Sequence, residues 1–226
     1  MFEDRRIVDL SHVLVPGKEE YGLKLITHNT ADLYPQYKVD KDTWYILQSI
    51  NMGSHCGTHI EFPYHHNRHG MDAGSFPLDR LIGPCLLFDF TWKNKNEAVT
   101  RKEIDAAGIA DPELRICPGD MVMFNFGVSG NYGTEKGHDR PYITEDAIHW
   151  LADEKKINLI GSDASGIEVK GVPNQPNHQY LMDRGIPIIE FANNLGALRK
   201  KRFTLFVLAL PIEGLDSCPV RLIAVE

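Results

Sequence analysis

The segment from residue 55 to residue 65 restricts the fold most, because it brings several potential metal ligands onto one short stretch of backbone. It reads His-Cys-Gly-Thr-His-Ile-Glu-Phe-Pro-Tyr-His, and the side chains of His55, His59 and Glu61 suit zinc, manganese or iron. Their even spacing, four residues and then two, places all three on one face of an extended chain. A helix would instead send Glu61 to the side opposite the two histidines. The segment is therefore predicted to be extended.

A bend is also required within this segment. In a straight strand, residues four positions apart lie roughly 13 Å from each other, so His55 and His59 would be too far apart to share an ion at about 2.1 Å. Gly57 lies between them and permits the bend, and Pro63 disfavours a helix further along. The alternative is a histidine-rich surface loop that binds no metal. The zincin helix motif, His-Glu-x-x-His, is absent from the segment.

Short apolar runs dominate much of the chain, including residues 85–90, 121–126 and 203–210, which are predicted to be strands. Only three or four helices are indicated, and the clearest are those capped by Thr100 and Thr144. This pattern is typical of an α/β or α+β fold.

Residues 44–52 are predicted to form a strand that leads into the metal segment, and residues 16–43 a long irregular loop. Such a loop is often a lid or a partner-binding arm, although a plain surface excursion is equally consistent with its composition. Tyr21, Trp44 and Phe62 are candidates for an aromatic wall around a substrate.

The overall composition argues against several classes of protein. The formal net charge is −7 and no basic patch is evident, which argues against a nucleic-acid partner. No apolar run approaches the length of a membrane span, and no N-terminal signal region is evident. The four cysteines are widely scattered, so a reduced, cytoplasmic protein is expected, with Cys56 in a structural role.

The metal segment resembles the His-x-Gly-Thr-His-x-Asp-x-Pro-x-His signature of the cyclase family of metal-dependent hydrolases, which includes bacterial kynurenine formamidases and isatin hydrolases. A Gly-x-Asp turn at residues 161–163 and an Ile-Pro-Ile-Ile-Glu run at residues 186–190 extend the resemblance over nearly the whole chain. The resemblance implies a single domain over residues 1–226, with the family's swivelling β/β/α fold. Such a fold has a mixed, partly barrel-like sheet and few helices, and relatives are commonly homodimers or homotetramers.

The resemblance also implies the second half of a site. His178 and Glu190 match family positions that ligate a second metal, which gives the implied metal ligands as His55, His59, Glu61, His178 and Glu190. His65 would act as the general base, and Glu190 would ligate or transfer protons. Glu190 lies among apolar residues and needs a partner in any case, so a buried salt bridge is the alternative. A contact at a helix N-terminus is the alternative for His178.

This sequence departs from the family pattern at two positions. Glu61 stands where the family usually has aspartate, and its longer side chain is expected to disfavour a bridge between two ions, leaving one tightly bound ion. Gly166 stands where many relatives have serine, and Ser165 is one residue early.

The function expected on these grounds is metal-dependent hydrolysis of a small amide, N-formyl amide or cyclic amide, in the manner of an arylformamidase or an isatin hydrolase. Zinc or manganese would activate a water molecule. A non-catalytic protein that binds a metal or a small ligand on the same fold is one alternative. A cupin-like metal oxygenase is another, but it would need a His-x-His pair on one strand, which the metal segment lacks.

Overall fold

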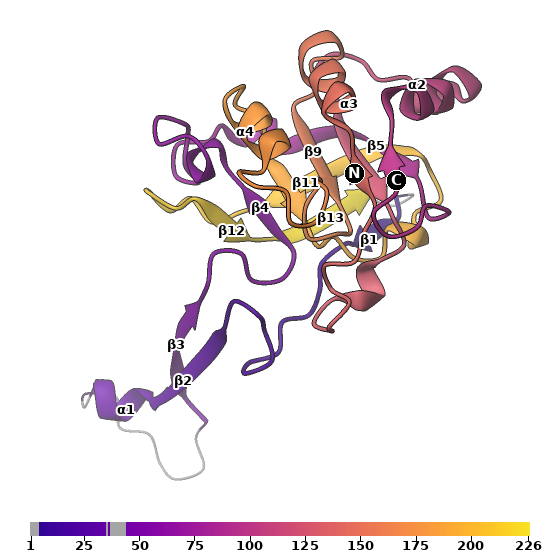
Figure 1. Ribbon diagram of the computed structural model, residues 1–226. Coiled ribbons are helices and arrows are strands. Elements are labelled where there is room, and N and C mark those ends of the chain that lie inside the picture. The colour runs from indigo at the N-terminus through magenta and orange to yellow at the C-terminus, as the bar shows by residue number, and fades with distance from the viewer. Residues whose placement is uncertain (1–4, 35, 37–43) are drawn as a thin grey trace.

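The computed structural model describes residues 5–34, 36 and 44–226. A mixed, curled sheet of nine strands forms its body, in the order β1-β13-β11-β5-β7-β9-β10-β4-β12 (Figure 1). The strands are β1 (Ile7–Asp9), β4 (His59–Glu61), β5 (Ile82–Asp89), β7 (Met121–Asn125), β9 (Leu159–Ser162), β10 (Ile188–Glu190), β11 (Arg202–Leu208), β12 (Ser217–Pro219) and β13 (Arg221–Val225). A smaller parallel pair joins β6 (Ala98–Val99) to β8 (Tyr142–Ile143). The predicted α/β class with a partly barrel-like sheet is confirmed.

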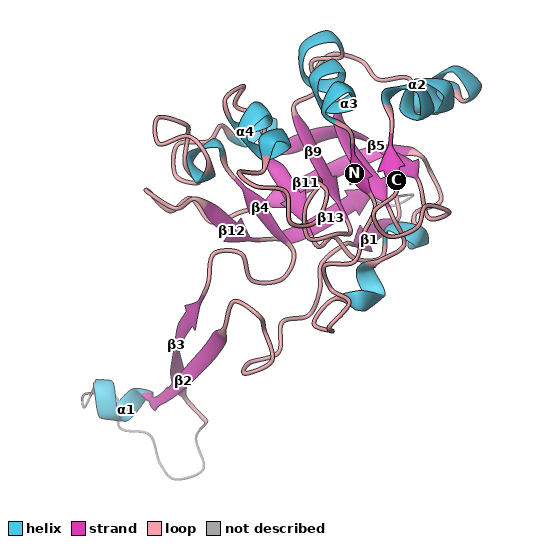
Figure 2. Cartoon of the chain, in the orientation of Figure 1, coloured by secondary structure: helices cyan, strands magenta, loops and turns pink. Residues whose placement is uncertain are grey.

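The helices are few and short, as predicted (Figure 2). They are α1 (Thr30–Leu33), α2 (Arg101–Ala110), α3 (Glu145–His149), which continues as a π-helical turn over Trp150–Glu154, and α4 (Pro176–Met182). Single 3₁₀ turns occur at Pro63–His65, Leu78–Arg80, Pro112–Leu114, Ser129–Asn131 and Leu195–Ala197. Thr100 and Thr144 cap α2 and α3 through their side chains, which confirms both predicted helix starts. None of the helices in the described residues is long and apolar enough to cross a membrane.

Both faces of the sheet are buried in its central region. Strands β5, β7, β9 and β10 run parallel, and their residues are largely apolar because side chains cover them on each side. One core cluster, which includes Phe124 and Ile188, lies on the face covered by α2, α3 and α4. The other cluster includes Met123 and Ile189 and fills the opposite face. The helix-covered face is the one that carries the candidate site.

An antiparallel hairpin projects from this body as an arm (Figure 1). Its strands β2 (Leu23–Asn29) and β3 (Ile46–Met52) pair over seven residues, and α1 follows β2. The strand expected over residues 44–52 is confirmed as β3, but the irregular loop expected over residues 16–43 is wrong for β2 and α1. The remainder of that loop, at residues 35 and 37–43, lies outside the described residues.

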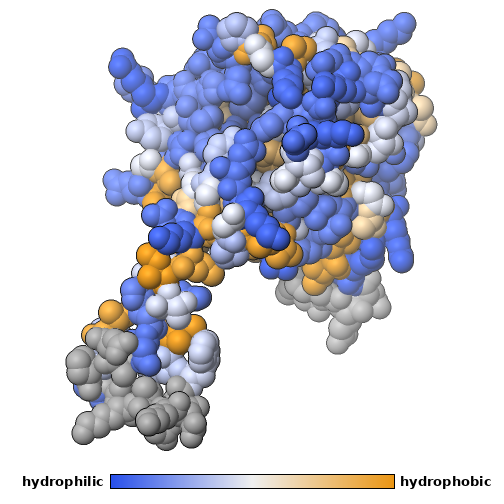
Figure 3. Space-filling model, turned by 60° about the horizontal axis from the view of Figure 1, so that its bottom comes forward, coloured by the Kyte–Doolittle hydropathy of each residue, from blue (hydrophilic) through white to orange (hydrophobic). Residues whose placement is uncertain are grey.

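Apolar side chains are exposed along this arm, as Figure 3 shows. They include Leu25, Ile26, Leu47, Ile50 and Met52, of which Ile50 is 64% exposed. The two strands of this hairpin contact mainly each other, so packing against the body of the protein does not determine which of their side chains are buried. An exposed apolar surface of this kind is typical of an interaction site.

Candidate metal centre

The bend predicted within the metal segment is present at Gly57, whose φ is +67°. The left-handed conformation favours glycine, and a Cβ at this position would lie 2.2 Å from Cδ2 of Leu14, so that side chain would have to move. The bend lets β4 begin at His59 and turns His55 back beside it, with their ring centroids 5.0 Å apart. Cys56 is fully buried, which agrees with the structural role expected for it.

His59 presents one ring nitrogen for a ligand. Its Nδ1 donates to the carbonyl oxygen of Gly57 at 2.8 Å, which fixes the neutral tautomer with a lone pair on Nε2. That Nε2 is buried and has no hydrogen-bond partner among the residues that the structure describes. It lies 3.8 Å from Oε1 of Glu61 and 3.6 Å from Oε2 of Glu190. Such an orphaned buried nitrogen facing two carboxylates is what a metal ligand needs.

Glu61 lies between two groups of donors. Its Oε1 is 3.0 Å from Nδ1 of His55, and its Oε2 is 3.1 Å from Nε2 of His178. The donor atoms of His55, His59 and Glu61 lie within 4.8 Å of one another, and so do those of Glu61, His178 and Glu190. The longer glutamate was expected to disfavour a bridge between two ions. Its carboxylate nevertheless lies within reach of both groups, and the number of bound ions stays a prediction.

The second group is assembled by tertiary contacts. Strands β10 and β4 pair antiparallel and place Glu190 directly opposite His59, on the helix-covered face. His178 comes from α4, and its Nε2 is 3.3 Å from Oε1 of Glu190. The five predicted metal ligands are therefore brought together from β4, β10, α4 and the loop before β4.

Glu168 holds His178 in place and was not predicted from the sequence. Its Oε2 accepts from Nδ1 of His178 at 2.6 Å, and its Oε1 accepts from the backbone N–H of His178 at 2.7 Å. Both side chains are almost fully buried. A carboxylate on the outer nitrogen directs the other nitrogen of the ring toward Glu61 and Glu190.

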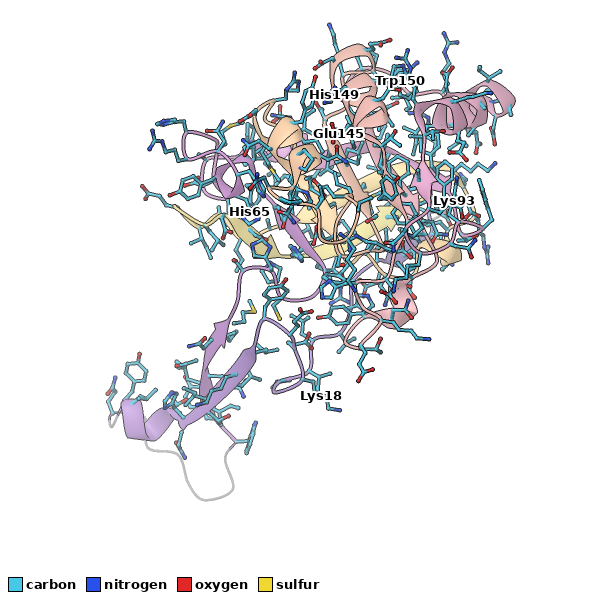
Figure 4. All side chains as sticks on the ribbon, in the orientation of Figure 1. Lys18, His65, Lys93, Glu145, His149 and Trp150 are labelled. Carbon is cyan, nitrogen blue, oxygen red and sulfur yellow. The ribbon has the colours of Figure 1, made fainter. Side chains whose placement is uncertain are left out.

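Asp216 plays the same part for the first group and was also not predicted. Its Oδ2 lies 3.0 Å from Nε2 of His55 and 2.9 Å from Nδ1 of His65. His65 follows β4 in a 3₁₀ turn, and Figure 4 shows it beside β4 and β12. Its Nε2 lies 3.7 Å from Oε1 of Glu61, so His65 reaches the edge of the donor groups.

The charges of the site depend on one another. Burial alone would raise the pKa of Glu61, but the nearby imidazoles of His178 and His55 outweigh it and hold that pKa well below its usual value. Burial would likewise lower the pKa of His55, but the carboxylates of Glu61 and Asp216 raise it to about 9. Glu61 is therefore an anion in a buried setting, which a divalent cation would neutralise.

A pocket of about 450 Å³ opens onto these groups. Besides the donors, its lining includes Tyr21, His138, Arg140, Ser165 and Lys170. Tyr21 thus lies where an aromatic wall was expected. The two other candidates are wrong: Phe62 is fully buried against Phe76 in the core, and Trp44 lies on the arm, 83% exposed.

The fold and the donor groups define a class, a curled mixed-sheet protein whose histidines and glutamates are able to hold a metal ion at one end of the sheet. The Cyclase family model, with the description "Putative cyclase", matches residues 8–169, and the chain belongs to this family. The predicted family is thereby confirmed.

Relatives of known type agree with this assignment. The kynurenine formamidase of Salinibacter ruber is 30% identical over 175 residues, which cover 77% of each chain. Isatin hydrolase A from Ralstonia solanacearum has the same fold, with a TM-score of 0.83 at 20% identity over 98% of this chain and 92% of that one. A predicted metal-dependent hydrolase from Bacillus stearothermophilus has a TM-score of 0.74 at 27% identity over 98% of both chains.

Proposed function

We propose that the protein is a metal-dependent hydrolase that cleaves the carbon–nitrogen bond of a small amide, N-formyl amide or cyclic amide. The observation that carries the proposal is the pair of donor groups that share Glu61, in which the buried Nε2 of His59 has no partner in the described part of the chain. Hydrolysis of amides by the formamidase and isatin hydrolase relatives supports the substrate class.

Zinc or manganese suits imidazole and carboxylate ligands, and either ion lowers the pKa of a bound water and polarises a carbonyl. His55, His59 and Glu61 would form one ion position, and Glu61, His178 and Glu190 a second. Glu168 and Asp216 would orient the histidines of the two positions from outside.

His65 is the residue we assign to proton transfer. Asp216 accepts from its Nδ1–H, which leaves the lone pair of Nε2 facing Glu61 and the pocket. His65 would take a proton from the attacking water and return it to the leaving nitrogen as the carbon–nitrogen bond breaks. The products are a carboxylic acid and an amine, or a single amino acid from a cyclic amide.

The proposal is tested by metal content and acid release together. The purified protein is loaded with zinc or manganese, analysed for metal, and assayed against a panel of N-formyl amides and cyclic amides. His59→Ala is expected to lose the ion and all hydrolysis while keeping its fold. Metal binding without release of acid from any amide would favour the non-catalytic alternative, and full metal occupancy in His59→Ala would refute the assigned ligands.

We also propose a homodimer or homotetramer, supported by the exposed apolar side chains of the arm. Sedimentation equilibrium of the wild type and of Ile50→Lys tests this, because a charge on the apolar arm should weaken self-association.

A further inference from the structure

Arg140 is a buried cation in the wall of the pocket and takes no part in the function proposed above. Arg140 lies just before β8 in the chain and is only 7% exposed. Its Nε donates to the carbonyl oxygen of Gly166 at 3.0 Å, and its Nη1 donates to the carbonyl oxygen of His138 and to Oγ of Ser165, each at 3.2 Å. Among the described residues, no hydrogen bond uses Nη2.

No carboxylate of the described chain forms an ion pair with Arg140, although a buried charge is costly unless it is paired. Glu190 and Glu168 are the acidic groups whose charges act on it from a distance. Both carboxylates have other partners, since Glu168 accepts a hydrogen bond from His178 and Glu190 belongs to the second donor group. The guanidinium therefore presents unused donors and a positive charge to the pocket.

Gly166 makes room for this arrangement. A Cβ at residue 166 would lie 2.8 Å from Nη2 of Arg140 and 3.2 Å from Oε1 of Glu190. The φ of Gly166 is +121°, a conformation that side-chain-bearing residues rarely adopt. At the position where the family pattern has serine, this chain therefore has the edge of a guanidinium beside a proposed metal ligand.

We propose that Nη2 of Arg140 binds a carboxylate on the substrate, so that the enzyme prefers amides with a carboxylate a few bonds from the scissile carbonyl. Lys170, which is paired with Asp139 at 3.3 Å, lines the same pocket, and so do the carboxylates of Glu61 and Glu190. The substrate would then lie with its carbonyl at the donor groups and its carboxylate at Arg140. This specificity role rests on the proposed amide hydrolysis.

The first test compares amides that differ only in the carboxylate. N-formylanthranilate is paired with formanilide, and N-formylglycine with N-methylformamide, and kcat/KM is measured for each with the zinc-loaded enzyme. The wild type should prefer the carboxylated member, and Arg140→Gln should reduce that preference by about 10- to 100-fold, the range for losing a hydrogen bond to a charged group. Arg140→Lys should recover part of it.

Arg80→Gln is the matched control. Arg80 is also partly buried and donates to two backbone carbonyl oxygens, those of Gly185 and Asn158, but it does not line the pocket. It should lose stability without changing the preference. If Arg140→Gln does not fold, Gly166→Ala replaces it, because its Cβ would displace Nη2 while the charge remains, and the preference should again fall.

A binding measurement separates this proposal from the proposed function. Anthranilate is titrated calorimetrically into zinc-loaded wild type, Arg140→Gln and Arg80→Gln. If no amide is hydrolysed, the proposed function fails, while weaker binding to Arg140→Gln alone still supports the carboxylate site. If all three bind anthranilate equally, the carboxylate is held by the ion and the role of Arg140 is refuted. Equal turnover of both members of each amide pair by the wild type would refute it as well.

Discussion

Replacing Glu168 with glutamine tests how the second donor group is held. The carboxylate of Glu168 accepts two bonds from one residue, from Nδ1–H of His178 at 2.6 Å and from its backbone N–H at 2.7 Å. Glutamine keeps the length of the side chain but has only one accepting oxygen. One of the two bonds is therefore lost, and the negative charge behind the imidazole is lost with it.

The size of the effect follows from both of these losses. A hydrogen bond to a charged group contributes about 1.5–3 kcal/mol. Removing the partner that orients a metal-binding histidine lowers metal affinity by about 10- to 100-fold, which corresponds to about 1.4–2.8 kcal/mol. The two ranges agree near 2 kcal/mol, so Glu168→Gln should weaken zinc binding at the second position by roughly 30-fold.

The assay is competition for zinc with a chromophoric chelator, together with elemental analysis and thermal unfolding. Glu226→Gln is the matched control, because the buried carboxylate of Glu226 also accepts bonds at both oxygens, Oε2 from the backbone N–H groups of Arg199 and Lys200, each at 2.9 Å, and Oε1 from Nη1 of Arg6. It should lower thermal stability without changing zinc affinity. If both variants bind zinc as the wild type does, Glu168 contributes to folding alone, and its role in zinc binding is refuted.

Three further substitutions and one control variant test the site. His65→Asn should retain zinc and lower kcat by about 10²–10⁴-fold, the usual contribution of a proton-transfer residue; loss of zinc would make His65 a ligand instead. Gly57→Ala should weaken zinc binding and lower the Tm, because a left-handed conformation costs about 1–2 kcal/mol in a residue with a Cβ and the methyl group meets Leu14. Gly133 has a similar φ of +69°, and a Cβ added there would meet no described atom within 4 Å. Gly133→Ala should therefore show the conformational cost alone. Glu61→Asp should reduce zinc stoichiometry, since the shorter carboxylate cannot reach both donor groups; unchanged stoichiometry would show that Glu61 does not bridge.

The local parts of the site were predictable from the sequence. Gly57, Pro63 and the even spacing of the ligands act within a few residues, so they fix the bend and the shared face by themselves. The same alternation would have placed Phe62, an even-numbered neighbour of Glu61, on the core side. Cys56, the even-numbered neighbour of His55, is buried in the same way.

The residues that orient the histidines depend on contacts between distant segments. Glu168 carried a usable signal, since it lies between Ile167 and Val169 as Glu190 lies among apolar residues. Asp216 is partly exposed and has no local signal; only the pairing of β12 with β4 brings it to His55 and His65. Strand β2 of the arm was missed for another reason, because it has no buried face and therefore no apolar alternation to reveal it.

Because of the pairing of β10 with β4, binding of the proposed ion would stabilise one register of these two strands over the others. Glu190 faces the donor groups only because it lies opposite His59, with Ile189 opposite Ile60 on the other face. A slip of one residue would turn Ile189 toward the donors and bury the carboxylate of Glu190 in the opposite core. Because the binding energy of an ion is added to the folding energy, only the native register would gain it. The ion would thus favour the native pairing of two strands that lie far apart in the chain.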